Sequence, residues 1–292
     1  MKKLLTAVLA VFVMFSGCLL TACNSDPVTF TYVALVNNTT GFTATDAQTG
    51  IAVGIKKDSP LKDSMNTYLN TLTTEYKENL MEKMVALANS DTATYTIDYD
   101  TNHSTANGTL KVGMECAYTP FNWTQNDNSN GAVPIANVAV KYANGYDVQI
   151  IAKVAAELGY ALEIYQYSWE ALVPAVKAGT LDAIAAGMSP TEERLAEIDF
   201  TVTYYQSNLV VVTREGSKIA SATTLAELDV AGVKIAAQPG TFHLDALNDQ
   251  TTNITVIDTY ADFVDMQIAL ESGLIDGYVA EKPTAMAFCA NA

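Results

Sequence analysis

Arg194 is the residue of this sequence best suited to bind an anion. It lies in a short charged segment that predicts a helix over 192–198. Its planar guanidinium presents a fork of N–H donors that matches a carboxylate. The start of the helix, at 189–192, adds free backbone amides and the positive end of the helix dipole. From the residues alone, Arg194 could bind a small carboxylate or form a surface ion pair with Glu193 or Glu197.

Residues that support covalent or metal chemistry are few. The chain has two histidines, His103 and His243, and no CxxC motif. We therefore expect no metal site, no cofactor and no nucleophile paired with a histidine. Glu115 and Glu281 could still act as a general acid or base. An enzyme that acts on a small carboxylic acid is thus the alternative to a binding protein.

The beginning of the chain has the pattern of a lipoprotein signal. A short basic segment, Met1-Lys2-Lys3, precedes an apolar run over 4–19, which is shorter than a membrane span. The sequence Leu20-Thr21-Ala22-Cys23 then resembles a lipobox. We predict a signal peptide over 1–22, a lipid on Cys23 and a polar tether over 23–27. The mature protein would then be anchored by lipid at the extracytoplasmic face of the cell membrane; an uncleaved signal anchor is the alternative.

Size and charge narrow the class further. The chain has 292 residues and a formal net charge of −16, which allows two lobes with separate cores and disfavours nucleic acid as a partner. Cys18 lies in the predicted signal peptide and Cys23 in the predicted lipobox. The remaining Cys116 and Cys289 could form a disulfide, but two buried free thiols are favoured.

Strands and helices alternate from residue 110 onwards, which predicts mainly parallel sheets covered on both faces. Apolar periodicity and helix caps place the boundaries. The predicted strands are 110–114, 161–165, 181–185, 207–213, 233–236, 254–257 and 274–280, and the predicted helices are 146–158, 168–179, 192–198, 224–228, one after 240, and 260–272.

One unit of the sequence is repeated. Ala175–Ala183 recurs as Ala269–Gly277: each copy is a helix end, a glycine stop and a strand that begins with Asp. Such units also recur by chance, but two copies suggest two similar lobes. The two strands would end near Gly187 and Glu281, and carboxyl ends of strands are where open α/β sheets bind ligands.

Five ordered segments carry a resemblance to a known family. They are Gly113–Trp123, Gly145–Lys153, Trp169–Ile184, Gly187–Arg194 and Ile198–Tyr205. Together they resemble the family 3 extracellular solute-binding proteins, the polar amino-acid receptors of ABC importers, over nearly all of 110–292. The resemblance implies a two-lobed α/β fold of the type II periplasmic-binding-protein class with two hinge crossings. It also implies a monomeric receptor, not an enzyme, which delivers an amino acid to an ABC permease and its ATPase.

The resemblance also implies a set of ligand-binding residues. Arg194 would bind the α-carboxylate of the cargo, and Glu281 stands where the family usually has Asp for the α-ammonium. Glu115 and Asp147 match positions that contact the distal end of the cargo in lysine and arginine receptors, which slightly favours a basic amino acid over a neutral polar one such as glutamine. The other implied contacts are Gly187, Met188 and Ser189 beside Arg194, Thr241 and Phe242 as a clamp from the second lobe, and Tyr118 and Trp169 as pocket walls.

The order of segments departs from the family. Relatives continue past a motif like 281–289 with a strand, a crossing and terminal helices, whereas this chain ends at Ala292. Resembling segments occur at the front: a strand at 30–35, a crossing at 49–59, and an apolar stripe from Leu61 to Leu87.

We therefore predict a circular permutation. Lobe 2 would be 28–49 with 205–292, lobe 1 would be 50–204, and 91–109 would link the family's usual ends. The alternative is a separate N-terminal domain before a truncated receptor. The permuted order predicts that 30–36 adds a strand to the sheet that contains 274–280.

Overall fold

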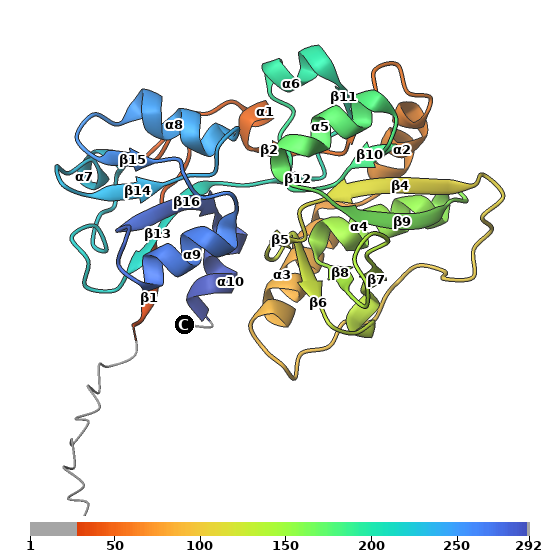
Figure 1. Ribbon diagram of the computed structural model, residues 1–292, viewed down its shortest axis with the longest axis horizontal. Coiled ribbons are helices and arrows are strands. Elements are labelled where there is room, and N and C mark those ends of the chain that lie inside the picture. Colours follow the sequence, from red (N-terminus) through yellow and green to blue (C-terminus); the bar gives the residue numbers. More distant parts are fainter. Residues whose placement is uncertain (1–27, 291–292) are drawn as a thin grey trace, which may run out of the picture.

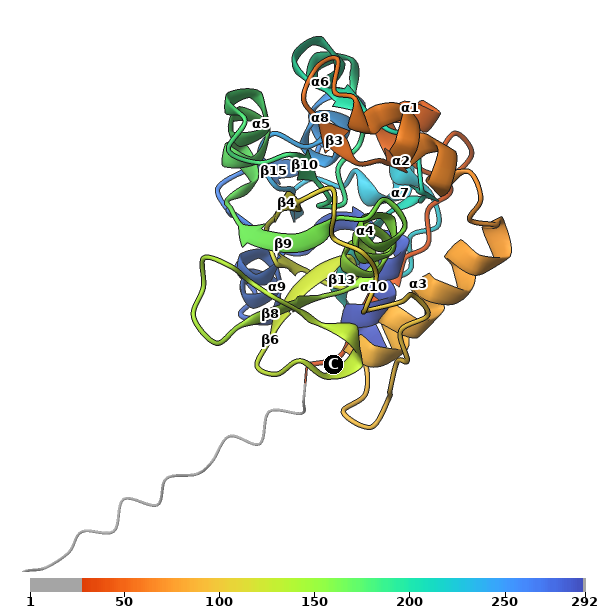
Figure 2. The same ribbon diagram turned by 90° about the vertical axis from the view of Figure 1, so that its right-hand side faces the viewer.

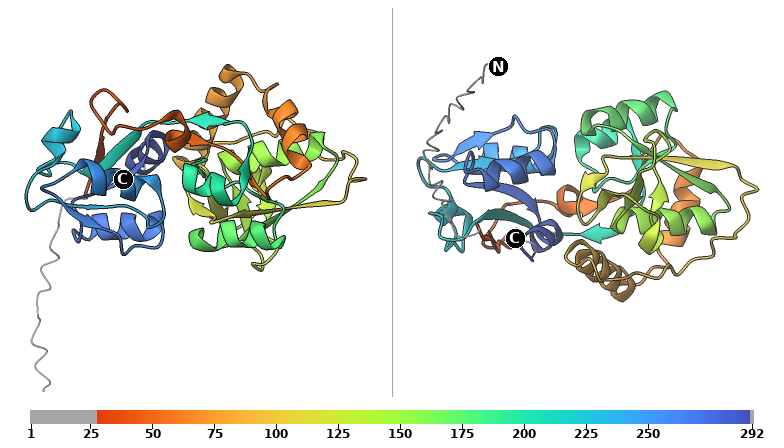
Figure 3. Two further views of the ribbon diagram at one scale, coloured as in Figure 1. Left: turned by 90° about the horizontal axis from the view of Figure 1, so that it is seen from above. Right: turned by 60° about the horizontal axis from the view of Figure 1, so that its bottom comes forward.

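The computed structural model describes residues 28–290 as two α/β lobes that lie side by side (Figure 1). The predicted signal peptide 1–22 and the segment 23–27 with Cys23 lie outside the described residues. Two short strands join the lobes: β2 (Gly50–Ile51) and β12 (Tyr205–Gln206) pair antiparallel between them. Two further views show the same narrow connection (Figure 3). The described part of the chain holds no helix long and apolar enough to cross a membrane.

Lobe 1 is built on a five-stranded sheet. Its strand order is β11 (Asp199–Phe200), β3 (Gly54–Ile55), β10 (Ala183–Ile184), β4 (Thr109–Met114) and β9 (Ala161–Gln166). Helices α4 (Tyr146–Glu157) and α5 (Trp169–Ala178) pack against this sheet. The remaining elements of the lobe are α2 (Leu61–Leu69), α3 (Thr74–Ala88), α6 (Glu192–Glu197), the 3-10 turn Ser129–Gly131, and a small sheet of β5 (Ala117–Tyr118), β6 (Asn122–Gln125), β8 (Tyr142–Asn144) and β7 (Val133–Pro134).

Lobe 2 is built on a second five-stranded sheet. Its strand order is β1 (Phe30–Val33), β13 (Leu209–Arg214), β16 (Gly277–Glu281), β14 (Lys234–Ala236) and β15 (Thr255–Ile257). Helix α8 (Phe242–Gln250) covers one face, and α9 (Phe263–Glu271) and α10 (Lys282–Ala290) cover the other (Figure 1). Two short helices complete the lobe: α1 (Asp46–Thr49) before the hinge and α7 (Leu225–Leu228).

Local sequence explains why these elements form. Strand β13 reads Leu-Val-Val-Val-Thr and is buried along nearly its whole length, as expected for a central strand rich in β-branched residues. Helix α5 ends at Gly179, whose φ of 74° is the left-handed conformation typical of a glycine cap, and Thr180 N–H donates to the Ala175 carbonyl.

The observed fold differs from the prediction in its sheet pattern. Parallel pairs join β10, β4 and β9 in lobe 1 and β16, β14 and β15 in lobe 2, but β3, β11, β1 and β13 pair antiparallel. The sheets are mixed because the chain reverses where it passes between the lobes. The predicted strand 181–185 is reduced to Ala183–Ile184, and β5 to β8, α1 and α10 were not predicted.

The segment ahead of residue 109 packs into both lobes. Strand β1 pairs with β13, which pairs with β16, so residues 30–33 extend the sheet of 277–281. The Phe30 ring lies 4.9 Å from that of Phe288 in α10. On the lobe 1 side, α3 lies beside α10 (Figure 2), and the stretch 91–108 is held by an Asp98–Lys153 ion pair at 2.6 Å. The addition of β1 to the sheet that contains β16 is what the permuted order predicts. The domain boundaries stay a prediction.

Candidate ligand-binding site

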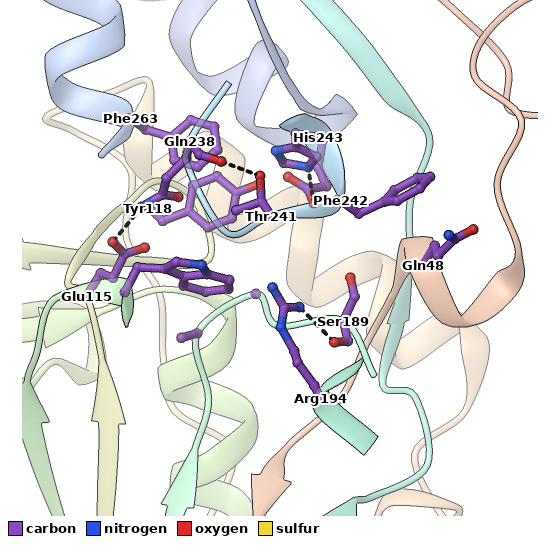
Figure 4. Close-up of a pocket in the computed structure, with 14 residues that line it drawn as sticks. Gln48, Glu115, Tyr118, Ser189, Arg194, Gln238, Thr241, Phe242, His243 and Phe263 are labelled. Atoms are coloured by element: carbon purple, nitrogen blue, oxygen red, sulfur yellow. Dashed lines mark hydrogen bonds and ion pairs between the residues drawn. The ribbon is translucent and has the colours of Figure 1, made fainter. Parts of the chain in front are cut away.

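A cavity of about 20 Å³ lies between the two lobes. That volume holds one or two water molecules, so the lobes are closed on each other. An outer hollow of about 500 Å³ adjoins it on the Arg194 side. The cavity is lined from lobe 1 by Glu115, Tyr118, Trp169, Ala186, Gly187, Ser189 and Arg194, and from lobe 2 by Gln48, Gln238, Thr241, Phe242, His243, Phe263 and Glu281 (Figure 4).

Arg194 provides the positive charge of the cavity. Thr191 caps α6 by accepting a hydrogen bond from the Arg194 N–H, at 3.4 Å. The guanidinium donates from Nη1 to the Ser189 carbonyl and from Nη2 to the Gly240 carbonyl, both at 2.8 Å. Burial lowers the pKa of Arg194 to about 10, so the side chain is still a cation at neutral pH.

The turn at Gly240 receives two hydrogen bonds across the cleft. It connects β14 to α8, and its φ of 69° is a conformation that favours glycine. Its carbonyl accepts from Arg194 and, at 3.0 Å, from the indole Nε1 of Trp169. Both donors belong to lobe 1 and the acceptor to lobe 2, so this one carbonyl helps hold the lobes together.

A buried acid stands on the lobe 2 side. Glu281 ends β16, and its Oε1 lies 3.0 Å from His243 Nε2. Burial raises the pKa of Glu281 to about 8, and burial together with nearby Arg194 lowers the pKa of His243 to about 3. Both shifts favour the uncharged forms, a carboxylic acid and a neutral imidazole. Glu281 Oε2 and His243 Nδ1 are buried and make no hydrogen bond with any described residue, which is costly unless a ligand pairs with them.

Two contacts close the other end of the cavity. Glu115 Oε1 accepts from Gln238 Nε2 at 2.8 Å, and burial raises the pKa of Glu115 to about 7. Beside this bond the rings of Tyr118 and Phe263 stack at 4.1 Å between centroids and 18° between planes. Each contact joins one residue of lobe 1 to one of lobe 2. The cavity thus has a cationic end, a buried acid and an aromatic end.

Comparison with known proteins identifies the class. Residues 110–266, more than half of the chain, match the bacterial extracellular solute-binding proteins, family 3. The chain belongs to this family. The solute-binding protein has a two-lobed fold of the type II class, which its structural relatives share.

Three relatives show the range of the similarity. A probable histidine-binding protein of Campylobacter jejuni is 30% identical over 190 residues, which are 65% of this chain and 66% of the relative, just under two thirds of its length. The arginine-bound structure of ArgBP from T. maritima, a mutant form, matches with a TM-score of 0.53 and 28% identity over 63% of this chain and 78% of that one. An ancestral amino acid-binding protein, a precursor of cyclohexadienyl dehydratase, matches with a TM-score of 0.52 and 25% identity over 62% and 74%.

Most residues predicted to bind the ligand line the cavity of the solute-binding protein. They are Glu115, Tyr118, Trp169, Gly187, Ser189, Arg194, Thr241, Phe242 and Glu281. Met188 and Asp147 do not. Met188 is buried behind the cavity wall, and its carbonyl accepts from the Ala52 N–H.

The prediction for Asp147 needs a correction. This carboxylate lies inside lobe 1, where Tyr204 Oη donates to it at 2.6 Å and Asn122 Nδ2 at 2.9 Å. The backbone N–H of Gly187, a cavity-wall residue, also donates to it, so Asp147 lies behind the wall. Asp147 is therefore part of the core of lobe 1, and Glu115 is the acid that reaches the distal end of the cavity.

Four polar or aromatic wall residues were missed. Gln238 and His243 flank the Gly240-Thr241-Phe242 motif, so their place on the same strand-to-helix turn was a usable signal. Gln48 and Phe263 come from helices α1 and α9, which reach the cavity only through the arrangement of the two lobes. No local pattern in the sequence indicates that arrangement.

Proposed function

We propose that this solute-binding protein captures an α-amino acid between its lobes and delivers it to an ABC permease and its ATPase. One observation carries the proposal: Arg194 of lobe 1 and Glu281 of lobe 2 line the same cavity. A zwitterion carries a carboxylate and an ammonium, and burying either without a partner is costly. A guanidinium and a carboxyl on opposite lobes meet both needs, and binding both would favour the closed state.

The distal end of the cavity supports a side chain that carries N–H donors. Glu115 offers a carboxyl group. The side-chain amide of Gln238 donates to Glu115 and to the Ala261 carbonyl, which leaves the side-chain oxygen of Gln238 as an acceptor. Relatives of this chain are named for histidine and arginine. We favour a basic amino acid slightly over a neutral polar one such as glutamine.

An extracytoplasmic, lipid-anchored location is part of this proposal. The family is one of extracellular proteins, and the sequence ahead of residue 28 has the pattern of a lipoprotein signal with Cys23 as the acylated residue. Mass spectrometry of the membrane fraction would test this by finding a lipid on Cys23.

We also propose that the chain order is a circular permutation of the family's. Support comes from β1, which extends the sheet of β16, and from the contact between Phe30 and Phe288. Lobe 2 would then consist of 28–49 and 205–292, lobe 1 of 50–204, and 91–109 would be the linker between the ancestral ends.

An enzyme of the same fold is the second candidate. Glu281 is buried beside His243 and its pKa is raised to about 8, as expected of a group that serves as a general acid. One structural relative is a precursor of a dehydratase. Turnover of a cyclic carboxylic acid on incubation with the protein would favour this candidate over transport.

Arg194→Ala tests the proposed function directly. In a thermal-shift screen against the common amino acids, the wild-type protein should gain about 2.7 kcal/mol of stability at a ligand concentration a hundredfold above Kd. Arg194→Ala should show no shift with any amino acid, and Arg194→Lys, which keeps the charge without the fork, only a small one.

The control is Lys177→Ala, which removes an exposed ion pair with Glu197 away from the cavity and should leave the shift intact. A full shift in Arg194→Ala would remove the basis of the assigned carboxylate contact.

A further inference from the structure

The closed cleft has no room for a cargo side chain. Its cavity of about 20 Å³ is the space of one or two water molecules, and even glycine needs more. The lobes must therefore separate to admit an amino acid. When the lobes close on an amino acid, its side chain contacts the residues that fill the Glu115 end of the cavity.

Two aromatic rings fill that end, one from each lobe. Phe263 is the first residue of α9, and its ring lies flat on that of Tyr118, at 4.1 Å and 18°. Each of the two residues is 3% exposed. Because they belong to different lobes, their contact forms only when the cleft closes.

Neither ring has space to retreat. Tyr118 is also stacked with the fully buried Phe121 at 5.0 Å, and the backbone of Gly187 lies so close that an added Cβ would stand 2.8 Å from the Tyr118 ring. Phe263 is backed edge-on by His243 at 6.1 Å and by Tyr278 at 6.3 Å. The two packed rings therefore limit how closely the two lobes can approach each other.

A long side chain would have to separate the rings of Tyr118 and Phe263. A group inserted between two rings needs about 7 Å between them, twice a normal carbon–carbon contact, against the 4.1 Å observed. Opening the cleft by that difference would break the neighbouring cross-lobe bond between Glu115 and Gln238, which is 2.8 Å long. A side chain too short to reach the rings needs no gap between them, so the lobes can close further on it than on a long one, and Glu115 and Gln238 then stay nearer to its N–H donor.

We propose that Phe263 is a selectivity residue that limits the length of the cargo side chain, so that the site takes short side chains with an N–H donor. The inference rests on the proposed capture of an α-amino acid and adds to it the size of the cargo. Glu115 and Gln238 set the chemistry of the side chain, whereas Phe263 sets its length.

A homologous series of diamino acids separates length from chemistry. Diaminopropionate, diaminobutyrate, ornithine and lysine differ only by methylene groups, and their Kd values can be measured by titration calorimetry with the full chain. The wild-type protein should bind the two shorter members most tightly. Phe263→Ala should move the optimum to ornithine or lysine and strengthen lysine binding about tenfold.

Two further variants make the result decisive. Val264→Ala changes the exposed neighbour of Phe263 on the same helix and should leave the length ranking unchanged. Phe263→Leu keeps an apolar side chain if the alanine variant does not fold, and should shift the optimum by one member of the series. Thermal denaturation of each variant confirms that it is folded.

The outcomes distinguish this inference from the proposed function. An unchanged ranking in Phe263→Ala or Phe263→Leu overturns the length limit and leaves amino-acid capture standing. Weaker binding of lysine by the variants also overturns it, because the ring would then contact the cargo. If the wild-type protein binds no amino acid at all, the proposed function fails and the inference fails with it.

Discussion

Among single residues, Glu281 has a protonation state that should make binding depend on pH. The carboxyl and the His243 imidazole are both buried and neutral at pH 7, since burial raises the pKa of the acid to about 8 and lowers that of the base to about 3. An ammonium group pairs favourably only with the ionised carboxylate. Binding an amino acid therefore requires Glu281 to lose its proton, and below pH 8 that proton leaves with binding.

Affinity should accordingly rise with pH. Because Glu281 is protonated below its pKa of about 8, Kd should fall by up to about tenfold for each unit as the pH rises toward 8. Titration calorimetry in buffers of different ionisation enthalpy should also detect release of nearly one proton per ligand at pH 6.

Two variants locate the effect. Glu281→Gln should bind weakly at every pH, and Glu115→Gln should keep the pH slope if the slope belongs to Glu281 and not to Glu115, whose pKa is about 7. Affinity that does not change between pH 6 and 8 would contradict the neutral state assigned to Glu281.

Among the elements, the turn between β14 and α8 couples the lobes. The Gly240 carbonyl accepts from Arg194 and Trp169, and these are the groups assigned to the cargo. A carboxylate bound by the Arg194 guanidinium would compete with this carbonyl for the same N–H donors.

Trp169→Phe should shift the ligand-free protein toward an open state. The change keeps an aromatic wall but removes the N–H that donates to Gly240, a bond worth about 1 kcal/mol, or a factor of about five in population. Small-angle X-ray scattering should show a larger radius of gyration for the ligand-free variant. Trp123→Phe, in β6, should not change it, and equal radii for all three proteins would contradict the coupling.

The sequence predicted the elements that have a regular pattern. The strands at 109–114 and 161–166 and the helices at 146–157 and 169–178 agree with expectation, because each has an apolar period and a glycine or a capping residue at its end. The strands of the small sheet span only two to four residues, too few for any period to appear.

The candidate site was predictable only in part, for a related reason. Arg194, Glu281 and Thr241 lie in local motifs, whereas Phe263 gains its position from a ring in the other lobe. The error at Asp147 has the same origin: its partners Asn122 and Tyr204 are 25 and 57 residues away. Contacts at such separations leave no trace in a local pattern.

At the scale of the whole molecule, the same packing of helices and strands should form from a chain that begins and ends at other residues. The contact between Phe30 and Phe288 brings the two ends of the described chain together, while residues 91–108 connect α3 to β4 along lobe 1. Ends that lie close at the surface can be joined, and an exposed turn can be opened.

A reordered chain should therefore fold and bind. We would join residue 290 to residue 28 with a short Gly-Ser linker, start the chain at Asn102 and end it at Thr101, without 1–27. Both residues are exposed, and the Asp98–Lys153 pair and the His103 contact with the Tyr160 carbonyl remain. The Tm should stay within a few degrees of the parent and Kd within about threefold.

A chain reopened inside β13, at Val211, is the control and should not fold, because the break interrupts an interior strand that is buried along nearly its whole length. Failure of the Asn102 chain to fold would contradict the proposed permutation.

The placement of β1 has a mechanical consequence. This strand is the first described element and lies at the edge of the lobe 2 sheet, two strands from the one that ends in Glu281. If Cys23 carries the proposed lipid, the anchor would hold lobe 2, and lobe 1 would be free to move about β2 and β12. A permease would then meet one lobe fixed near the membrane and one mobile lobe, and Arg194 would belong to the mobile lobe.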